Sequence, residues 1–303
     1  MNRAWLVVSL CACAFVTSAQ TSEISYQGLN ALTNQFDQTF PIVYSLPDAS
    51  RFGPGPYPVF VWVAGTFEYF DDPLASFLMA AMNLRGFLAA TVDYSNSELV
   101  QTCGQYQPRA QSIFSASQAG SAAQSICSLS SANCNLAEKG GIVVMGASQG
   151  GLIAMLARNY NPNVMAVYAM SIGDAVPAAY DYFPCEDKTS TAFPSDKITV
   201  IDGESDEFFQ PVQQELQNVT GLACPAGATQ CWNSDGSGGG WYIVQNTQVQ
   251  SGDANHCYFI SSSSCFSIGD TTWMFGSENW SLGPNLDWLA SFGTHRNFSA
   301  NGL

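Results

Sequence analysis

Histidine and basic residues are scarce in this sequence. Its 303 residues include two histidines, His256 and His295, so any mechanism or metal site that needs imidazole must use one of them. Only 9 lysines and arginines oppose 24 acidic residues, for a formal net charge of −15. Such a chain repels phosphate backbones, so we expect no nucleic-acid partner. The hydrophobic fraction of 47% supports a sizeable core and excludes a disordered chain.

Long apolar runs are missing beyond the N-terminus, and we therefore expect no stable membrane insertion. The N-terminus itself predicts a secretory signal peptide. Arg3 supplies a positive start, residues 4–16 are apolar, and small residues at 17–19 allow cleavage before Gln20. The apolar run is too short for a membrane anchor. We expect an extracellular mature chain of residues 20–303. It shows no internal repeat or linker, which favours one domain and a monomer.

A zinc motif is absent as well, because the sequence has no C-x2-C pair and few histidines. We expect no metal and no cofactor. An even number of cysteines in an exported chain indicates disulfides. The simplest pairing, one of many, joins neighbours in the sequence and leaves a distant pair: Cys127/Cys134, Cys224/Cys231, Cys257/Cys265 and Cys103/Cys185. Sequons at Asn218, Asn279 and Asn297 fit a secreted glycoprotein, although this composition produces about as many by chance.

Short apolar, β-branched runs alternate with helix-like stretches along the chain. The runs predict strands at 40–46, 58–64, 87–94, 141–145, 164–170, 198–202 and 241–245. Helical spacing predicts helices at 72–84, 110–129, 150–159, 207–219 and 285–292. This alternation is typical of an α/β fold with a mostly parallel sheet.

Two segments interrupt this alternation. Residues 175–194 are rich in Pro, Tyr and Asp, and they predict either a surface excursion that forms part of a substrate rim or an ordinary loop pinned by Cys185. Residues 234–240 predict a flexible loop. Aromatic residues near the predicted loops either line an apolar cleft or belong to the core: Phe67, Tyr69, Phe70, Tyr180, Tyr182 and Phe183.

A candidate nucleophile lies between a predicted strand and a predicted helix. Residues 146–150, GASQG, fit the pattern G-x-S-x-G, with Ser148 at its centre. A serine at such a turn has a strained backbone and needs small neighbours. The following helix directs its N-terminal amides to the same place, which favours developing negative charge. No Gly-Lys-Ser/Thr is present, which excludes a phosphate-binding loop.

The segment GIVVMGASQGG resembles the nucleophile elbow of α/β-hydrolases, and its Ser-Gln-Gly core is similar to that of secreted lipases and cutinases. The resemblance implies an α/β-hydrolase fold with a catalytic triad in the chain order Ser, acid, His. His256 matches the loop of the catalytic histidine, with His295 as the alternative. Asp206 matches the acid of a G-x-x-D turn, with Asp174 as the alternative.

The same resemblance assigns the oxyanion hole to the amide of Gln149 and to Thr66 in the loop after the strand at 58–64. Thr66 as a simple turn residue is the competing interpretation, and Ala64 stands where the family often has histidine. The sequence therefore predicts a secreted carboxylic ester hydrolase, similar to lipases, esterases and cutinases, with an acyl-enzyme intermediate. Its ester substrate would be a small molecule, a lipid or a polymer. A peptidase or amidase on the same triad, and a non-catalytic binding protein on the same scaffold, remain alternatives.

Overall fold

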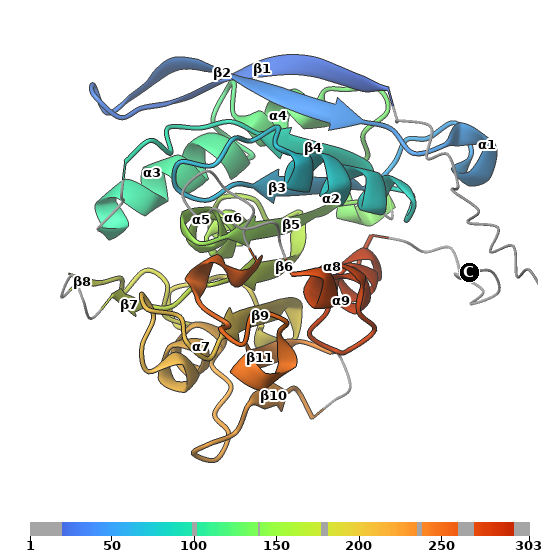
Figure 1. The fold of residues 1–303 in the computed structure, drawn as a ribbon. Helices are drawn as coiled ribbons and strands as arrows, with labels where there is room; N and C mark the ends of the chain where they lie inside the picture. The colour runs from blue at the N-terminus through green and yellow to red at the C-terminus, as the bar shows by residue number, and fades with distance from the viewer. Residues whose placement is uncertain are drawn as a thin grey trace, which may run out of the picture.

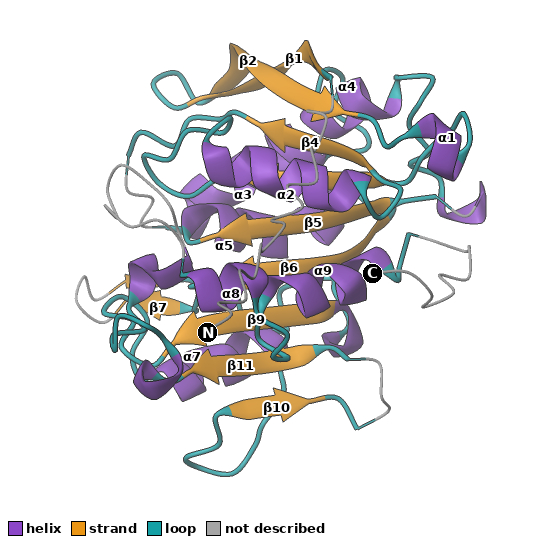
Figure 2. Ribbon diagram, turned by 45° about the vertical axis from the view of Figure 1, so that its right-hand side comes forward, coloured by secondary structure: helices purple, strands orange, loops and turns teal. Residues whose placement is uncertain are grey.

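A nine-stranded sheet forms the centre of the molecule (Figures 1 and 2). The computed structural model describes residues 20–98, 102–138, 140–176, 181–234, 238–259 and 270–293. Along the sheet the order is β1 (Thr21–Asn30), β2 (Gln35–Ser45), β4 (Leu88–Val92), β3 (Val59–Val63), β5 (Ile142–Ala147), β6 (Val164–Met170), β9 (Ile198–Gly203), β11 (Gly240–Val244) and β10 (Gln230–Trp232). The strands from β4 to β11 in this order are parallel, while β1, β2 and β10 pair antiparallel with their neighbours.

The central strands are buried on both faces of the sheet. In β3, the side chains of Val59, Val61 and Val63 enter one apolar cluster. Phe60 and Trp62, which alternate with them, enter the cluster on the opposite face. A continuous apolar run is therefore needed here, because neither face of the strand meets water.

Helices cover both faces of this sheet. One apolar cluster includes side chains of α3 (Cys103–Phe114), α4 (Ala122–Cys127), α5 (Gln149–Met155), α6 (Ala157–Tyr160) and α7 (Val212–Thr220). The opposite cluster includes side chains of α2 (Pro73–Asn83), α8 (Thr271–Phe275) and α9 (Leu282–Ala290). A short helix, α1 (Ala49–Phe52), lies at the margin of the molecule (Figure 1). The predicted α/β class, with a mostly parallel sheet between helices, is confirmed.

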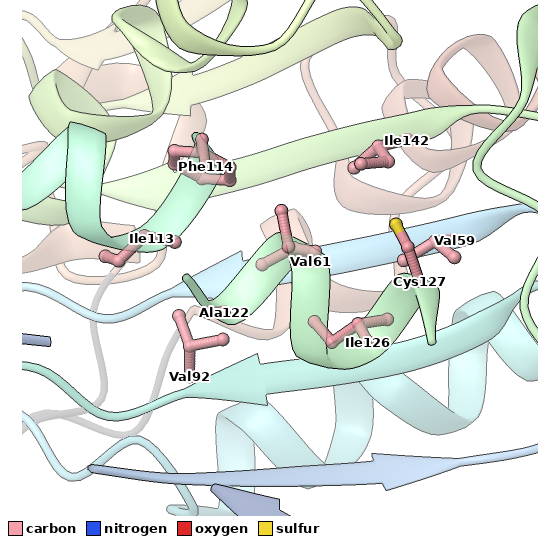
Figure 3. Close-up of a pocket in the computed structure, with 10 residues that line it drawn as sticks. Val59, Val61, Val92, Ile113, Phe114, Ala122, Ile126, Cys127 and Ile142 are labelled. Atoms are coloured by element: carbon pink, nitrogen blue, oxygen red, sulfur yellow. The ribbon is translucent and has the colours of Figure 1, made fainter. Parts of the chain in front are cut away.

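A narrow gap lies in the apolar layer beneath α4, between that helix and strands β3, β4 and β5 (Figure 3). Its lining is entirely apolar: Val59, Val61, Val92, Ile113, Phe114, Ala122, Ala123, Ile126, Cys127 and Ile142. The gap leaves no room for a water-sized sphere. It is a packing feature of the core rather than a binding site.

The predicted helix at 110–129 is wrong in its extent, because two helices occupy this region. α3 begins at Cys103 and ends at Phe114, where the hydroxyl of Ser115 accepts hydrogen bonds from the amides of Ser117 and Gln118. Gly120 has a φ of 81°, a conformation that a helix interior excludes. The side chain of Ser121 then accepts from the amide of Gln124 and caps α4.

Other boundaries differ for similar local reasons. The helix predicted from residue 207 begins at Val212, because Asp206 binds the amides of Phe208 and Phe209 in a turn and Pro211 precedes the first helical residue. β1 was not predicted, since its first half is polar and exposed at the edge of the sheet. The helix α8 and the strand β10 were not predicted either, because both are too short for their sequences to show a clear periodicity of apolar residues.

The segment at 175–194 is only partly a surface excursion. It contains a small hairpin of β7 (Ala175–Val176) and β8 (Asp181–Tyr182). Phe183, Glu186 and Phe193 are nevertheless buried, and Cys185 is bonded to Cys103 of α3. The predicted pairs Cys103–Cys185, Cys127–Cys134 and Cys224–Cys231 are confirmed. The pair Cys257/Cys265 and the signal peptide at 1–19 involve positions outside the described residues.

Candidate active site

Ser148 occupies a sharp turn between β5 and α5. Its backbone has φ 50° and ψ −125°, a conformation that residues other than glycine rarely adopt. A Cβ atom on Gly150 would lie 2.2 Å from the carbonyl oxygen of Val63, and one on Gly146 would lie 2.4 Å from the carbonyl oxygen of Gly150. These glycines are therefore required, because α5 approaches the end of β3 at Gly150 and approaches β5 at Gly146 too closely for larger residues.

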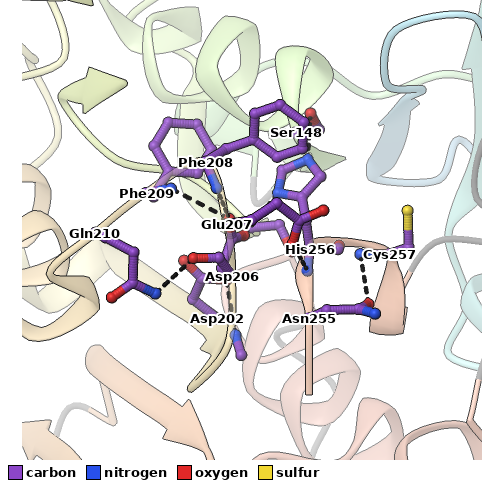
Figure 4. Close-up of polar contacts among 12 residues, drawn as sticks. Ser148, Asp202, Asp206, Glu207, Phe208, Phe209, Gln210, Asn255, His256 and Cys257 are labelled. Atoms are coloured by element: carbon purple, nitrogen blue, oxygen red, sulfur yellow. Dashed lines mark hydrogen bonds and ion pairs between the residues drawn. The ribbon is translucent and has the colours of Figure 1, made fainter. Parts of the chain in front are cut away.

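His256 lies between the hydroxyl of Ser148 and the carboxyl of Asp206 (Figure 4). Its Nε2 atom is 2.9 Å from Ser148 Oγ, and its Nδ1 atom is 2.6 Å from Asp206 Oδ2. The three residues come from the turns after β5, β9 and β11, and the parallel strands bring these ends to one edge of the sheet. In this arrangement, with the imidazole between a hydroxyl and a carboxylate, a histidine can accept the proton of a serine.

Backbone amides hold the carboxyl of Asp206 in place. Its Oδ1 atom accepts hydrogen bonds from the amides of Phe208, at 2.7 Å, and Phe209, at 3.2 Å. Burial raises the pKa of Asp206, but the hydrogen bond and charge of His256 act in the opposite direction and leave the pKa below its usual value. The carboxyl therefore remains an anion in neutral solution, suited to orient the imidazole.

His256 is fixed by contacts on several sides. Its carbonyl oxygen accepts from the hydroxyl of Ser171 at 3.1 Å, and its amide donates to Glu207 Oε2 at 3.2 Å. The ring of Phe208 packs edge-on against the imidazole, with 4.6 Å between the ring centroids. The imidazole is therefore held in one orientation although His256 lies outside the sheet, at the start of a short 3-10 helix.

Gln149 and Thr66 lie together beside Ser148. The Nε2 atom of Gln149 donates to Thr66 Oγ1 at 3.1 Å and to the carbonyl oxygen of Glu98 at 3.0 Å. Within the described part of the chain, the backbone amides of Gln149 and Thr66 donate to no acceptor. Both amides are thus available to an incoming oxygen.

The loop that carries Thr66 has supports that the sequence did not point out. The amide of Gly65 donates to the buried carboxyl of Glu68. The side-chain amide of Asn96 donates to the carbonyl oxygens of Gly65 and Glu68, each at 2.8 Å. Tyr94 donates to the carbonyl oxygen of Ala64 at 2.7 Å. Three polar side chains, those of Glu68, Tyr94 and Asn96, therefore hold the loop that carries Thr66.

Comparison with solved structures identifies the fold of this chain. No protein-family model and no curated protein matches the sequence. Among solved structures, a bacterial heroin esterase superposes with a TM-score of 0.52 and 14% identity, over 92% of this chain and 86% of that chain. The chain has the α/β-hydrolase fold. An S-formylglutathione hydrolase from Agrobacterium tumefaciens superposes with a TM-score of 0.48 and 12% sequence identity, over 91% of this chain and 96% of that chain. A hypothetical protein, PA2218 from Pseudomonas aeruginosa, superposes with a TM-score of 0.39 and 17% sequence identity. The match covers 52% of this chain, and it spans less than half, 44%, of the length of that protein.

The alternative acid, Asp174, does not join the arrangement around Ser148. In the α/β-hydrolase fold described here, Asp174 follows β6, and its carboxyl lies among Glu215, Asp187 and Asn218. Burial, followed by a hydrogen bond to Glu215, raises the pKa of Asp174 to about 6. Nδ1 of His256 is already bonded to Asp206. The other alternative, His295, lies outside the described residues.

The aromatic residues named from the sequence divide into two groups. Phe67 is 50% exposed and Tyr69 is 71% exposed, so both are accessible on the loop that carries Thr66. Phe183 is instead buried, with its ring 5.1 Å from that of Tyr106. Tyr180 lies outside the described residues. Among the residues described, no three acidic, cysteine or histidine side chains are arranged to hold a metal ion.

Proposed function

We propose that this chain is a serine hydrolase that cleaves carboxylic esters through a Ser148–His256–Asp206 triad. The observation that carries the proposal is the pair of short contacts from His256, to Ser148 Oγ on one side and to Asp206 Oδ2 on the other. A serine hydroxyl is a weak nucleophile in neutral water and requires such a base. The strained turn at Ser148 and its glycine neighbours are also features of this chemistry.

The reaction begins when Ser148 Oγ attacks the ester carbonyl while Nε2 of His256 takes the hydroxyl proton. The carbonyl oxygen becomes an oxyanion, which accepts hydrogen bonds from the amides of Gln149 and Thr66. Asp206 stabilises the imidazolium. His256 then gives its proton to the leaving alkoxide, and an acyl-Ser148 ester remains. Water repeats the sequence with the same base and releases the acid.

The choice of an ester substrate rests on more limited support. The heroin esterase that superposes with a TM-score of 0.52 is an esterase by name, and the exposed Phe67 offers an apolar contact near the site. No contact in the described residues favours a peptide. We also propose that residues 1–19 are a cleaved signal peptide and that residues 20–303 act outside the cell as one catalytic domain. Disulfides are typical of that compartment.

The test compares the parent protein with Ser148→Ala and His256→Ala on p-nitrophenyl esters and on peptide anilides. We expect ester hydrolysis in the parent and a loss of about 10³-fold or more in kcat for each variant. A matched control is Ser125→Ala in α4, which lies outside the proposed triad and should keep its activity. Faster cleavage of anilides would identify a peptidase or amidase. Full activity in Ser148→Ala would refute the proposed nucleophile, and an inactive parent would favour a binding protein.

A further inference from the structure

A second carboxyl lies behind the triad acid. Asp202 is the fifth residue of β9 and is completely buried. Its Oδ1 atom accepts a hydrogen bond from the amide of Gly203 at 2.7 Å. Its Oδ2 atom is also buried and receives no hydrogen from any donor among the described residues. The side chain lies beside that of Asp206, as Figure 4 shows.

Two carboxyl groups in such contact cannot both be ionised without strong repulsion. The surroundings decide which of them keeps a proton. Among the described residues, Asp206 accepts from the amides of Phe208 and Phe209 and from His256, whereas Asp202 accepts only from Gly203. The negative charge is therefore stabilised on Asp206, and a proton on Oδ2 of Asp202 gives that orphan atom a partner.

Burial and the neighbouring acidic side chains act in the same direction on Asp202. Among the described residues, the ionisable side chains that act on Asp202 are Asp206 and Glu207, both from the turn after β9, while His256, from the segment after β11, is bonded to Asp206. In β11, the residue paired with Asp202 is the apolar Ile243. In α7, the carboxyl of Glu215 is bound to the amides of Asp174 and Ala175. Burial raises the pKa of Asp202, and the charge of Asp206 raises it further.

We propose that Asp202 is a positioning residue that stays protonated and donates a hydrogen bond from Oδ2 to the carboxylate of Asp206. The inference rests on the proposed function, since it assigns Asp206 as the acid that orients His256. The donated bond fixes the rotation of the Asp206 carboxyl. It also makes that carboxylate a weaker base, so His256 is held as an imidazolium less strongly than a lone carboxylate would hold it. Asp202 thus sets the pH above which the base is free to act.

Two substitutions separate this role from a purely structural one. Asp202→Asn keeps an acceptor for Gly203 and a donor for Asp206, and it carries no charge. We expect its kcat/KM to stay within about threefold of the parent, with the acid limb of the pH profile unmoved. Asp202→Val keeps the approximate volume but removes the donor. We expect a loss of about tenfold in kcat and an upward shift of the acid limb by about half a pH unit.

The experiment measures kcat and kcat/KM for p-nitrophenyl acetate from about pH 5 to 9 in the full mature chain. Asp253→Asn is the control, because Asp253 is an exposed acid near His256 and its loss reports the effect of a solvated charge. An acid limb that moves to lower pH in Asp202→Asn by more than in the control would mean that Asp202 is ionised, and would overturn the proposal. An unchanged profile in Asp202→Val would overturn it too.

Direct observation of the carboxyl covers the case in which Asp202→Val fails to fold. In protein labelled with ¹³C at aspartate carboxyls, we expect one protonated signal that does not titrate near neutral pH and that disappears in Asp202→Asn. Absence of that signal from the parent would refute the protonated state. Ser148→Ala is measured in parallel, so that a failure of the proposed function appears as retained activity there and not as a change in Asp202.

Discussion

Replacing Ser148 with glycine should give a more stable protein than replacing it with alanine, although both changes remove the hydroxyl. The φ of 50° and ψ of −125° at this position cost a residue with a Cβ atom roughly 1–3 kcal/mol. Glycine avoids that cost, but its unfolded chain is more flexible, which offsets about 0.4–1 kcal/mol. Glycine also lacks the partly buried methyl group of alanine. Half of the value for a fully buried group is about 0.4 kcal/mol, which further reduces the advantage of glycine. We expect a net advantage of about 1 kcal/mol for Ser148→Gly.

The assay is urea unfolding followed by tryptophan fluorescence for both variants at the same pH. Ser125 in the interior of α4 provides the control pair, because its backbone is helical and Ser125→Gly should be about 0.5–1 kcal/mol less stable than Ser125→Ala. The sign of the glycine–alanine difference should therefore reverse between the two positions. If Ser148→Gly proves no more stable than Ser148→Ala, the turn is not strained, and our account of its glycine-rich surroundings is wrong.

Three further outcomes follow from the same contacts. Replacing Cys103 and Cys185 with serine opens a link across 82 residues and should lower the free energy of unfolding by about 4.5 kcal/mol, against about 2.4 kcal/mol for either 7-residue link, as measured in urea. Burial raises the pKa of Glu68 from 4.5 to about 8, so the folded chain binds more protons between these values and its stability falls as the pH rises. Glu68→Gln should reduce that fall, and an unchanged slope in urea unfolding between about pH 5 and 8 would contradict the assignment. Gly150→Ala should abolish soluble folded protein, because the new Cβ would lie 2.2 Å from the carbonyl oxygen of Val63, and a normal circular dichroism spectrum would refute this.

The sheet was predictable where burial alone decides the sequence. β3 and β5 need apolar residues on both faces, and their sequences, VFVWV and IVVMGA, are accordingly continuous runs of apolar or small residues. The edge strand β1 has no such requirement and was missed. The break between α3 and α4 depends on hydrogen bonds from Ser115 and on the conformation of Gly120, which helical spacing does not register.

The candidate site divides in the same way. Ser148 was predictable because a tight turn restricts its neighbours to small residues in a recognisable pattern. Asp206 and His256 were proposed from their order along the chain, and in the structure His256 contacts both Asp206 and Ser148. Asp202 and Glu68 had no sequence signal, since a buried acid is indistinguishable from a solvated one until the packing around it is known.

The central claim is that His256, held by Asp206, makes the hydroxyl of Ser148 reactive. Treatment of the folded mature chain with a fluorophosphonate probe, followed by peptide mapping, tests it most directly. We predict rapid labelling at Ser148 in the parent and labelling slowed by about 10³-fold or more in His256→Ala. A folded parent that leaves Ser148 unlabelled, or a His256→Ala variant labelled as fast as the parent, would contradict the account.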